Sequence, residues 1–224
     1  LIRKLQLPGC IFTILLIACT TLPFITSQAQ EIETSYLSIS DGLASPTVND
    51  VMQDTFGLLW IATTNGLQLY DGYHIETYKN VLGKPTTLQS NETWRIAEDA
   101  DRNIWVTNAL GVSKFDRIKN EFINYPLARI FNMAAEGGRA FKILIDSKNL
   151  VWVVTQNLEL VVYDPKTKEW TQAKYEVPDV AQPNHQGFSM AITEDAAGGL
   201  WFGSTNYNLM HRAPNGDTFK PIPI

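Results

Sequence analysis

The chain has 224 residues, of which 45% are hydrophobic and 11% aromatic, and its formal net charge at pH 7 is -5. This apolar content is sufficient for a continuous core, so the composition excludes a chain that is disordered throughout. The acidic balance disfavours nucleic-acid binding, because a protein that follows a phosphate backbone needs a basic face.

The first 29 residues have the organisation of a secretory signal. Arg3 and Lys4 precede an apolar run at 11–18, and small or polar residues follow at 26–29. This order predicts a signal peptide, residues 1–29, that is cleaved after Ala29. The apolar run is shorter than the roughly 20 residues that a membrane-spanning helix needs. We therefore expect an exported chain, located in the periplasm, that begins at residue 30.

The two cysteines, Cys10 and Cys19, lie inside this segment. Cleavage after Ala29 would remove both, and with three histidines in the chain we expect no metal and no cofactor. A calcium site built from oxygen ligands stays an alternative. Residues 16–19, Leu-Ile-Ala-Cys, also resemble a bacterial lipoprotein box, in which Cys19 would be acylated. The apolar residues beyond Cys19 favour the cleaved signal over this lipid anchor.

Four tandem repeats occupy the remainder, residues 30–224. Each repeat has a tryptophan that is preceded six residues earlier by an aspartate, and the tryptophans are 45, 47 and 49 residues apart. The four pairs are Asp54 and Trp60, Asp99 and Trp105, Asp146 and Trp152, and Asp195 and Trp201. Regular spacing of this kind predicts a repeat architecture.

Each repeat predicts four strands. Apolar stretches on either side of a short polar turn, around each Asp and Trp pair, indicate the first two strands. Third strands are indicated at 66–71, 111–116 and 160–164, and fourth strands at 75–78, 122–125, 170–173 and 219–222. Four antiparallel strands in about 40–50 residues make one propeller blade. We therefore predict an all-β fold, a β-propeller segment of four four-stranded antiparallel blades over about 46–78, 92–125, 139–173 and 187–222.

The eight repeated residues have an expected structural role. A four-stranded sheet cannot bury both of its faces alone, so we expect the four tryptophans to lie as wedges between neighbouring blades. Each aspartate precedes a short turn, where its carboxylate can accept hydrogen bonds from turn amides. A catalytic or metal-binding role for these aspartates is the less favoured alternative.

The ring of blades is expected to be incomplete. Residues 33–39 resemble an outer blade strand but precede the first repeat, whereas the fourth repeat has an outer strand of its own at 219–222. The segment 33–39 would therefore close a last blade that this chain lacks. We expect at least one further blade beyond Ile224, and a chain that is a fragment of a longer product.

The first repeat resembles the two-component regulator propeller family. The residues that carry the resemblance are Asp41-Gly42-Leu43 and the stretches 51–54, 57–63 and 66–72. The resemblance extends over about residues 33–224. The third repeat departs from the pattern with Glu159 near the position of a turn glycine, and the fourth has Asn208 there.

The resemblance implies an amino-terminal fragment of the periplasmic sensor region of a Bacteroidetes-type hybrid two-component histidine kinase. Such a protein would be a homodimer through its full length and would be held in the inner membrane by a transmembrane helix that is missing here. No phosphoacceptor box surrounds His74, His185 or His211. Kinase activity and the phosphorelay are therefore expected only in a missing carboxy-terminal part.

A ligand site is expected on one face of the blades. Long connections at about 79–92, 126–139 and 174–187 should open on the same face as the turns between second and third strands. The candidates there are Asn49, Trp94, Arg95, Arg139, His185 and Gln186 near the blade starts, and Asn65, Asn108, Asn157 and Asn206 in the second turns. Aromatic and amide groups suit a sugar. The structural alternatives are blade packing for Trp94, a surface loop position for His185, and turn preference for the asparagines.

Three functions fit these features. The favoured one is a sensory module that binds a small oligosaccharide or another periplasmic ligand, with the glycan class implied by the resemblance alone. The second is a propeller glycan lyase or hydrolase, which needs converging carboxylates, whereas Glu92, Asp101, Glu136 and Asp179 show no paired spacing. The third is a protein-interaction scaffold. We expect no catalytic residue in this chain.

Overall fold

The computed structural model describes residues 36–132, 134–156, 160–176, 191–204 and 208–222. The predicted signal peptide therefore lies outside the described residues. The chain divides into two compact units, Leu1–Tyr36 and Leu37–Ile224, and all described strands belong to the second.

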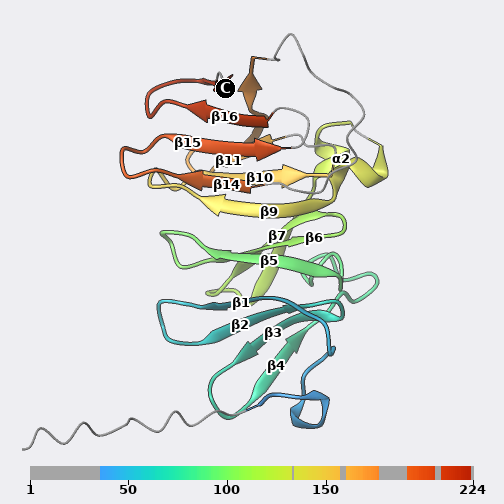
Figure 1. Cartoon of the computed structure of the whole chain (residues 1–224). Helices are drawn as coiled ribbons and strands as arrows, with labels where there is room; N and C mark the ends of the chain where they lie inside the picture. Colours follow the sequence, from blue (N-terminus) through green and yellow to red (C-terminus); the bar gives the residue numbers. More distant parts are fainter. Residues whose placement is uncertain (1–35, 133, 157–159, 177–190, 205–207, 223–224) are drawn as a thin grey trace, which may run out of the picture. The chain divides into compact units, whose positions relative to one another are not determined.

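The described strands form four sheets, each from consecutive segments of the chain (Figure 1). Blade 1 contains β1 (Val48–Gln53), β2 (Leu59–Thr63), β3 (Gly66–Tyr70) and β4 (Ile75–Tyr78). Blade 2 contains β5 (Thr93–Glu98), β6 (Ile104–Asn108), β7 (Gly111–Asp116) and β8 (Glu121–Pro126). Blade 3 contains β9 (Ala140–Ile145), β10 (Val151–Thr155), β11 (Leu160–Asp164) and β12 (Glu169–Gln172). Blade 4 contains β14 (Ala191–Glu194), β15 (Leu200–Ser204), β16 (Asn208–Arg212) and β17 (Thr218–Pro221).

Successive strands of every blade pair in antiparallel fashion, and the first strands β1, β5, β9 and β14 pack against one another from blade to blade (Figure 1). The prediction of an all-β propeller segment with four blades is confirmed. Blade 4 has one addition, because the two-residue strand β13 (Lys174–Tyr175) pairs in parallel with β17 at its outer edge. The chain that leaves blade 3 thus covers the edge of the blade that it is about to form.

The apolar core lies between the blades. Three buried clusters are present in the described residues, and each is shared by two consecutive blades. Trp60 belongs to the cluster between blades 1 and 2, Trp105 to that between blades 2 and 3, and Trp152 to that between blades 3 and 4. Their exposed fractions are 0%, 0% and 3%. Because a blade shares its core with its neighbours, blade contacts hold this unit together.

The described helices are short and lie in the connections. The 3-10 helix η1 (Ile39–Asp41) precedes blade 1, and α2 (Leu127–Ile130) and η2 (Ala135–Gly138) lie between blades 2 and 3. Leu127 of α2 is fully buried in the cluster between those blades. The connection therefore contributes to the blade interface.

The outer strand predicted at 33–39 falls partly outside the described residues. In its described part, residues 36–38 have no strand pairing and Ile39 begins η1. A strand forms only against a partner strand, and among the described residues none pairs with this segment. A strand that closes a further blade stays a prediction.

Candidate functional site

The strand registers bring the blade starts and the second turns to one side of the sheets. Val48 at the start of β1 pairs with Thr63 at the end of β2, and Thr93 likewise pairs with Asn108 in blade 2. Blade 3 follows the same pattern. We call this side, with the connections 79–92 and 127–139, the loop face.

The inner strands of blades 1 to 3 each have a register shift close to their start. The shift lies at Asn49 in β1, at Trp94 and Arg95 in β5, and at Phe141 in β9. A β-bulge bends its strand and redirects the bulged side chains, and bulges are frequent beside functional sites. Three of the predicted ligand residues, Asn49, Trp94 and Arg95, therefore occupy equivalent bulges on the loop face.

The bulged polar side chains connect blades 1 and 2. The amide Nδ2 of Asn49 donates to the carbonyl oxygen of Thr93 at 2.7 Å. The guanidinium of Arg95 donates to the carbonyl oxygens of Asn49 and Trp94. Asp50 accepts a hydrogen bond from the amide of Ile96 at 3.0 Å. These groups already have protein partners, so a ligand here would meet a preorganised surface.

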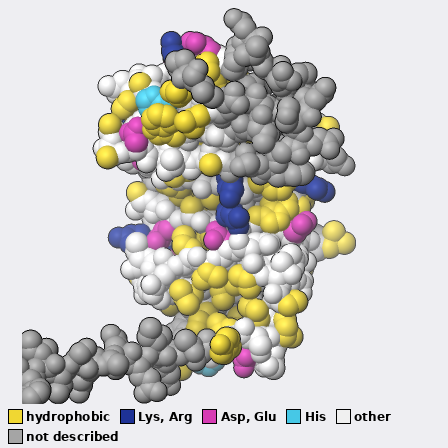
Figure 2. All heavy atoms as spheres, viewed as in Figure 1, with side chains coloured by type: hydrophobic (Ala, Val, Ile, Leu, Met, Phe, Trp, Pro, Cys, Tyr) yellow, Lys and Arg dark blue, Asp and Glu magenta, His cyan; other side chains and the backbone are white. Residues whose placement is uncertain are grey.

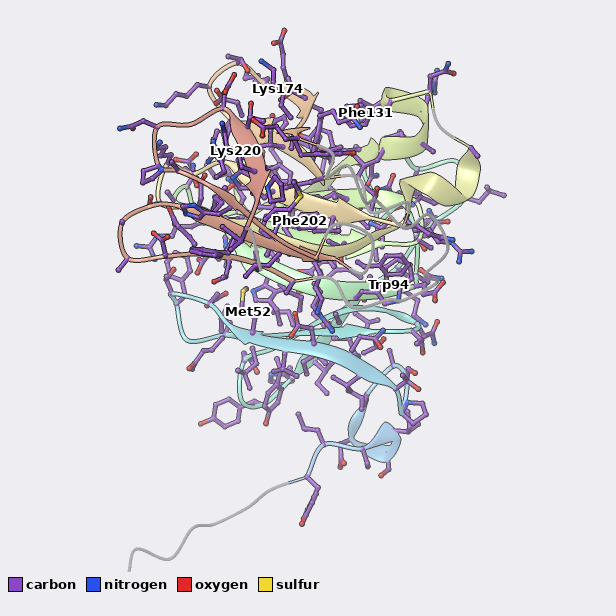
Figure 3. The ribbon with its side chains drawn as sticks, turned by 45° about the horizontal axis from the view of Figure 1, so that its top comes forward. Met52, Trp94, Phe131, Lys174, Phe202 and Lys220 are labelled. Atoms are coloured by element: carbon purple, nitrogen blue, oxygen red, sulfur yellow. The ribbon has the colours of Figure 1, made fainter. Side chains whose placement is uncertain are left out.

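Trp94 connects blades 2 and 3. Its ring lies over that of Phe141, with centroids 4.9 Å apart and an angle of 33° between the planes. Both side chains are only partly buried. Figure 3 shows Trp94 at the end of the strands where the connection that carries α2 also lies. The pair thus combines the blade packing of the structural alternative with an aromatic surface open to solvent.

The other candidates have different surroundings. Asn65 is exposed, and its Nδ2 donates to the carbonyl of Ala44 at 2.9 Å. The side chain of Asn108 is fully buried and donates to Ser113 Oγ at 3.0 Å. It therefore stabilises its own hairpin and is not open to a ligand in this structure. Arg139 is exposed on the connection before β9. Asn157, His185, Gln186 and Asn206 lie outside the described residues.

Each repeated aspartate holds its tryptophan through a hydrogen bond. The indole Nε1 donates to Oδ2 of the paired carboxylate at 2.8, 2.7, 2.8 and 2.8 Å in blades 1 to 4. The other carboxylate oxygen accepts amides of the turn, as Asp54 Oδ1 does from Phe56 and Leu58 at 2.9 Å. The sequence reasoning missed the indole bond, although the constant six-residue spacing was its signal. These carboxylates are thus engaged in holding the blades.

Asp54 has an additional partner from the next blade. Nη2 of Arg117 lies 2.7 Å from Asp54 Oδ2, and the guanidinium also covers the ring of Trp60 at 5.5 Å. Burial raises the pKa of Asp54, but the hydrogen bonds from Arg117, Trp60 and the turn amides outweigh it, so the pKa lies below its usual value. The aspartate is therefore held ionised between blades 1 and 2.

A hollow of about 630 Å³ lies at the rim, between the connection before blade 2 and the outer strand β8. Leu82, Pro85, Phe122 and Asn124 are among its lining residues. The hollow belongs to the loop face, since most of its lining comes from the connection 79–92, where the sequence predicts a ligand site. Gln89, which lines it, donates to Asn108 Oδ1 at 3.2 Å, in the second turn that pairs with Thr93 beside the bulge of β5.

By its fold, the described part of the chain belongs to the class of β-propeller segments. No family model matches the chain. It is 30% identical over 70 residues to histidine kinase P4 of Formosa agariphila, which is 31% of this chain and 5% of that protein. The extracellular domain of a proposed hybrid two-component system from Bacteroides thetaiotaomicron superposes with a TM-score of 0.63 at 18% identity, over 86% of this chain and 24% of that one.

A similar structure of another kind is virginiamycin B lyase from Staphylococcus aureus, with a TM-score of 0.56 and 16% identity over 79% of this chain and 56% of the lyase. At these identities the structures establish the fold. The resemblance to two-component regulator propellers, predicted from the first repeat, is confirmed by the sensor domain and the histidine kinase among the similar proteins. None of the helices in the described ranges is long and apolar enough to span a membrane.

Proposed function

We propose that this chain is part of the extracytoplasmic ligand-binding propeller of a two-component sensor, and that it binds a glycan-derived oligosaccharide on the loop face. The observation that carries the proposal is the recurrence of a bulge at the same place in three inner strands, which sets Asn49, Trp94 and Arg95 on one face. A partly open aromatic ring beside amide and guanidinium groups offers the stacking and the hydrogen bonds that a sugar uses.

The same residues offer a way to couple binding to a change in the propeller. Asn49 and Arg95 connect blade 1 to blade 2, and Trp94 connects blade 2 to blade 3. A ligand that contacts them would alter the relative free energies of blade arrangements, and it can shift an equilibrium only by its differential affinity. The kinase, the membrane anchor and the homodimer belong, in this proposal, to the rest of a longer protein.

The test is thermal unfolding of the purified chain with a panel of oligosaccharides prepared from different polysaccharides. A bound sugar should raise the melting temperature saturably, because a hundredfold excess over Kd adds about 2.7 kcal/mol of stability. Trp94→Ala should weaken the affinity about two- to tenfold, because an aromatic contact contributes about 0.5–1.5 kcal/mol. Tyr73→Ala is the matched control, since Tyr73 is an exposed aromatic on the opposite side of blade 1.

Two results would overturn the proposal. Binding that Trp94→Ala leaves unchanged, in a variant whose circular dichroism is native, would place the ligand elsewhere. Conversion of an oligosaccharide to shorter or unsaturated products would favour the enzyme alternative, which the fold of the lyase also accommodates. Trp94→Leu keeps an apolar contact with Phe141 but removes the aromatic face, so it separates loss of stacking on the ligand from loss of blade packing.

A further inference from the structure

Neighbouring blades are joined in a repeated way at the turns between their first and second strands. Thr55 of blade 1 donates from its amide and from its hydroxyl to the carboxylate of Glu98 in blade 2, at 2.8 Å in both bonds. Ser147 of blade 3 does the same to Glu194 of blade 4, at 2.8 and 2.6 Å. We call each pair, a hydroxyl residue in one blade and a glutamate in the next, a carboxylate clasp. Hydrogen bonds to an ionised carboxylate are roughly twice as strong as neutral ones.

The interface between blades 2 and 3 has neither half of a clasp. Ala100 has the place of Thr55, because each follows a repeated aspartate directly. Ile145 has the place of Glu98, because each is the last residue of the first strand of its blade. The amide of Ala100 donates instead to the side-chain oxygen of Asn149 at 2.9 Å. In the described part of the chain, the clasps therefore join the blades in two pairs.

The loop-face ends of these interfaces differ in the same sense. Asn49, Asp50 and Arg95 join blades 1 and 2 there by hydrogen bonds. Blades 2 and 3 meet there through the rings of Trp94 and Phe141. Figure 2 shows hydrophobic side chains open to solvent in the region of these two blades. Apolar contact is not directional, so it fixes the relative position of two blades less sharply than hydrogen bonds do.

The interior of the interface between blades 2 and 3 holds polar atoms that are poorly bonded. Tyr163 and Trp170 have the places that Phe115 and Phe122 have between blades 1 and 2. The hydroxyls of Tyr163 and Tyr125 are 3.4 Å apart, beyond the usual O–H···O distance of about 2.7–2.8 Å. The buried Nε1 of Trp170 has no hydrogen-bond partner among the described residues. Because buried polar groups are nearly always bonded, a second packing of the blades that satisfies these groups would be favoured.

We propose that the interface between blades 2 and 3 is a joint, at which blades 1 and 2 shift as one body against blades 3 and 4. Small sliding of packed elements is the shear type of conformational change. Trp94 spans the joint at the loop face through its contact with Phe141. Under the function proposed above, a sugar on the Trp94 ring would therefore contact both moving halves and select one of their arrangements.

The test is pulsed electron paramagnetic resonance of the purified chain with two spin labels, after Cys10 and Cys19 are replaced by serine. The label positions are equivalent exposed residues in the turns between third and fourth strands, which are Tyr73, Ile118, Lys166 and Asn215 in blades 1 to 4. Cysteines at 118 and 166 report on the joint, and those at 73 and 118 or at 166 and 215 report on the clasped interfaces. The distance distribution across the joint should be broader than the other two.

A clasp transferred to the joint gives the deciding measurement. Ala100→Thr together with Ile145→Glu supplies both halves, so the distribution between labels at 118 and 166 should narrow to the width of the clasped interfaces. Ala100→Val with Ile145→Glu is the matched control, because valine has the shape of threonine without its hydroxyl, and it should narrow the distribution less. The reciprocal variant, Ser147→Ala with Glu194→Ile, should broaden the distribution between 166 and 215. Circular dichroism verifies that each variant is folded.

Two results would overturn the joint. One is equal widths at all three interfaces of the wild type, and the other is a width at the joint that the transferred clasp leaves unchanged in a folded variant. If that variant does not fold, an unchanged width in the reciprocal variant overturns it equally. These measurements need no ligand, so a chain that binds no oligosaccharide can still have the joint, and binding to a chain with equal widths would remove the joint alone.

Discussion

A single carboxylate in each repeat ties an indole to the turn that precedes it. In blade 1 this carboxylate, Asp54, also receives the guanidinium of Arg117 from blade 2, and its side chain is completely buried in the process. Hydrogen bonds to a charged group contribute about 1.5–3 kcal/mol each when a partner is removed. The residue therefore stabilises a turn, a core tryptophan and a blade contact together.

The lowered pKa of Asp54 makes part of this stability depend on pH. Burial raises the pKa, but the bonds from Arg117, Trp60 and the turn amides lower it further than burial raises it, so the pKa lies below its usual value. A group whose pKa is depressed in the folded state stabilises the fold above its unfolded pKa of about 3.9. That contribution is lost as the pH falls through the folded value.

We expect Asp54→Asn to lower the free energy of unfolding at pH 7 by about 1–3 kcal/mol. Between pH 5 and pH 3, about the region where carboxylates titrate, the urea midpoint of the wild type should fall more than that of the variant. Arg117→Ala, which removes one of the bonds, should show an intermediate slope. Equal pH slopes for all three proteins would show that Asp54 is not held ionised by these contacts.

Among the elements, the hairpin between β6 and β7 of blade 2 leaves very little space for a side chain at its glycine. Gly111 begins β7 with a φ of 138°, and a Cβ there would press on the carbonyl oxygen of Tyr125 and lie 2.9 Å from the amide nitrogen of Leu127. Gly72, in the next turn of blade 1, has a φ of 98° but nothing within 4 Å of a Cβ. Both glycines have a positive φ, but only at Gly111 would a Cβ also clash with neighbouring backbone atoms.

We expect Gly111→Ala to destabilise the chain more than Gly72→Ala. Strain at a positive φ costs about 1–3 kcal/mol in either variant, and Gly111→Ala must in addition move the outer strand β8. Urea unfolding of both variants measures the difference. Equal losses of stability would mean that β8 can move away from a Cβ at position 111 without a further loss of stability.

Much of the element pattern could be predicted because it is local. The fourth strand predicted at 75–78 coincides with β4, and the one at 219–222 is displaced by one residue from β17. β13 could not be predicted, since a two-residue strand has no periodicity and exists only by pairing with β17. The bulges at Asn49 and Trp94 likewise depend on register, which hydrophobic alternation does not specify to the residue.

The candidate site could be predicted less well than the fold. The amide of Asn108 bonds Ser113 next to its own turn. A polar side chain at a turn position can form its hydrogen bonds locally or with a ligand, and the sequence does not distinguish the two cases. Arg117 was missed, since its partner Asp54 is 63 residues away and no spacing rule connects them. Contacts between blades depend on how whole blades pack against each other, which a local sequence pattern does not specify.

At the scale of the whole molecule, the blades do not have separate cores. Leu160 belongs to blade 3, but it is fully buried in the cluster that Phe202, Met210 and Phe219 of blade 4 complete. The clusters between the earlier blades are shared in the same way. In repeat architectures, stability is approximately the sum of intrinsic repeat terms and interface terms. Because each of the described clusters lies between two blades, we expect the interface terms to be large here.

We therefore expect Leu160→Ala to lower the stability of the whole described unit rather than of blade 3 alone. The loss should be about 2–5 kcal/mol, because the substitution leaves a cavity between two blades. Urea unfolding followed by tryptophan fluorescence and by circular dichroism should give coincident transitions, both displaced to lower urea. Leu82→Ala, at a residue that is 98% exposed, should leave them in place. Two separated transitions in the variant would mean that blades 1 and 2 are stable without the rest, and that their own interface, with Asp54 and Arg117, is sufficient to hold them.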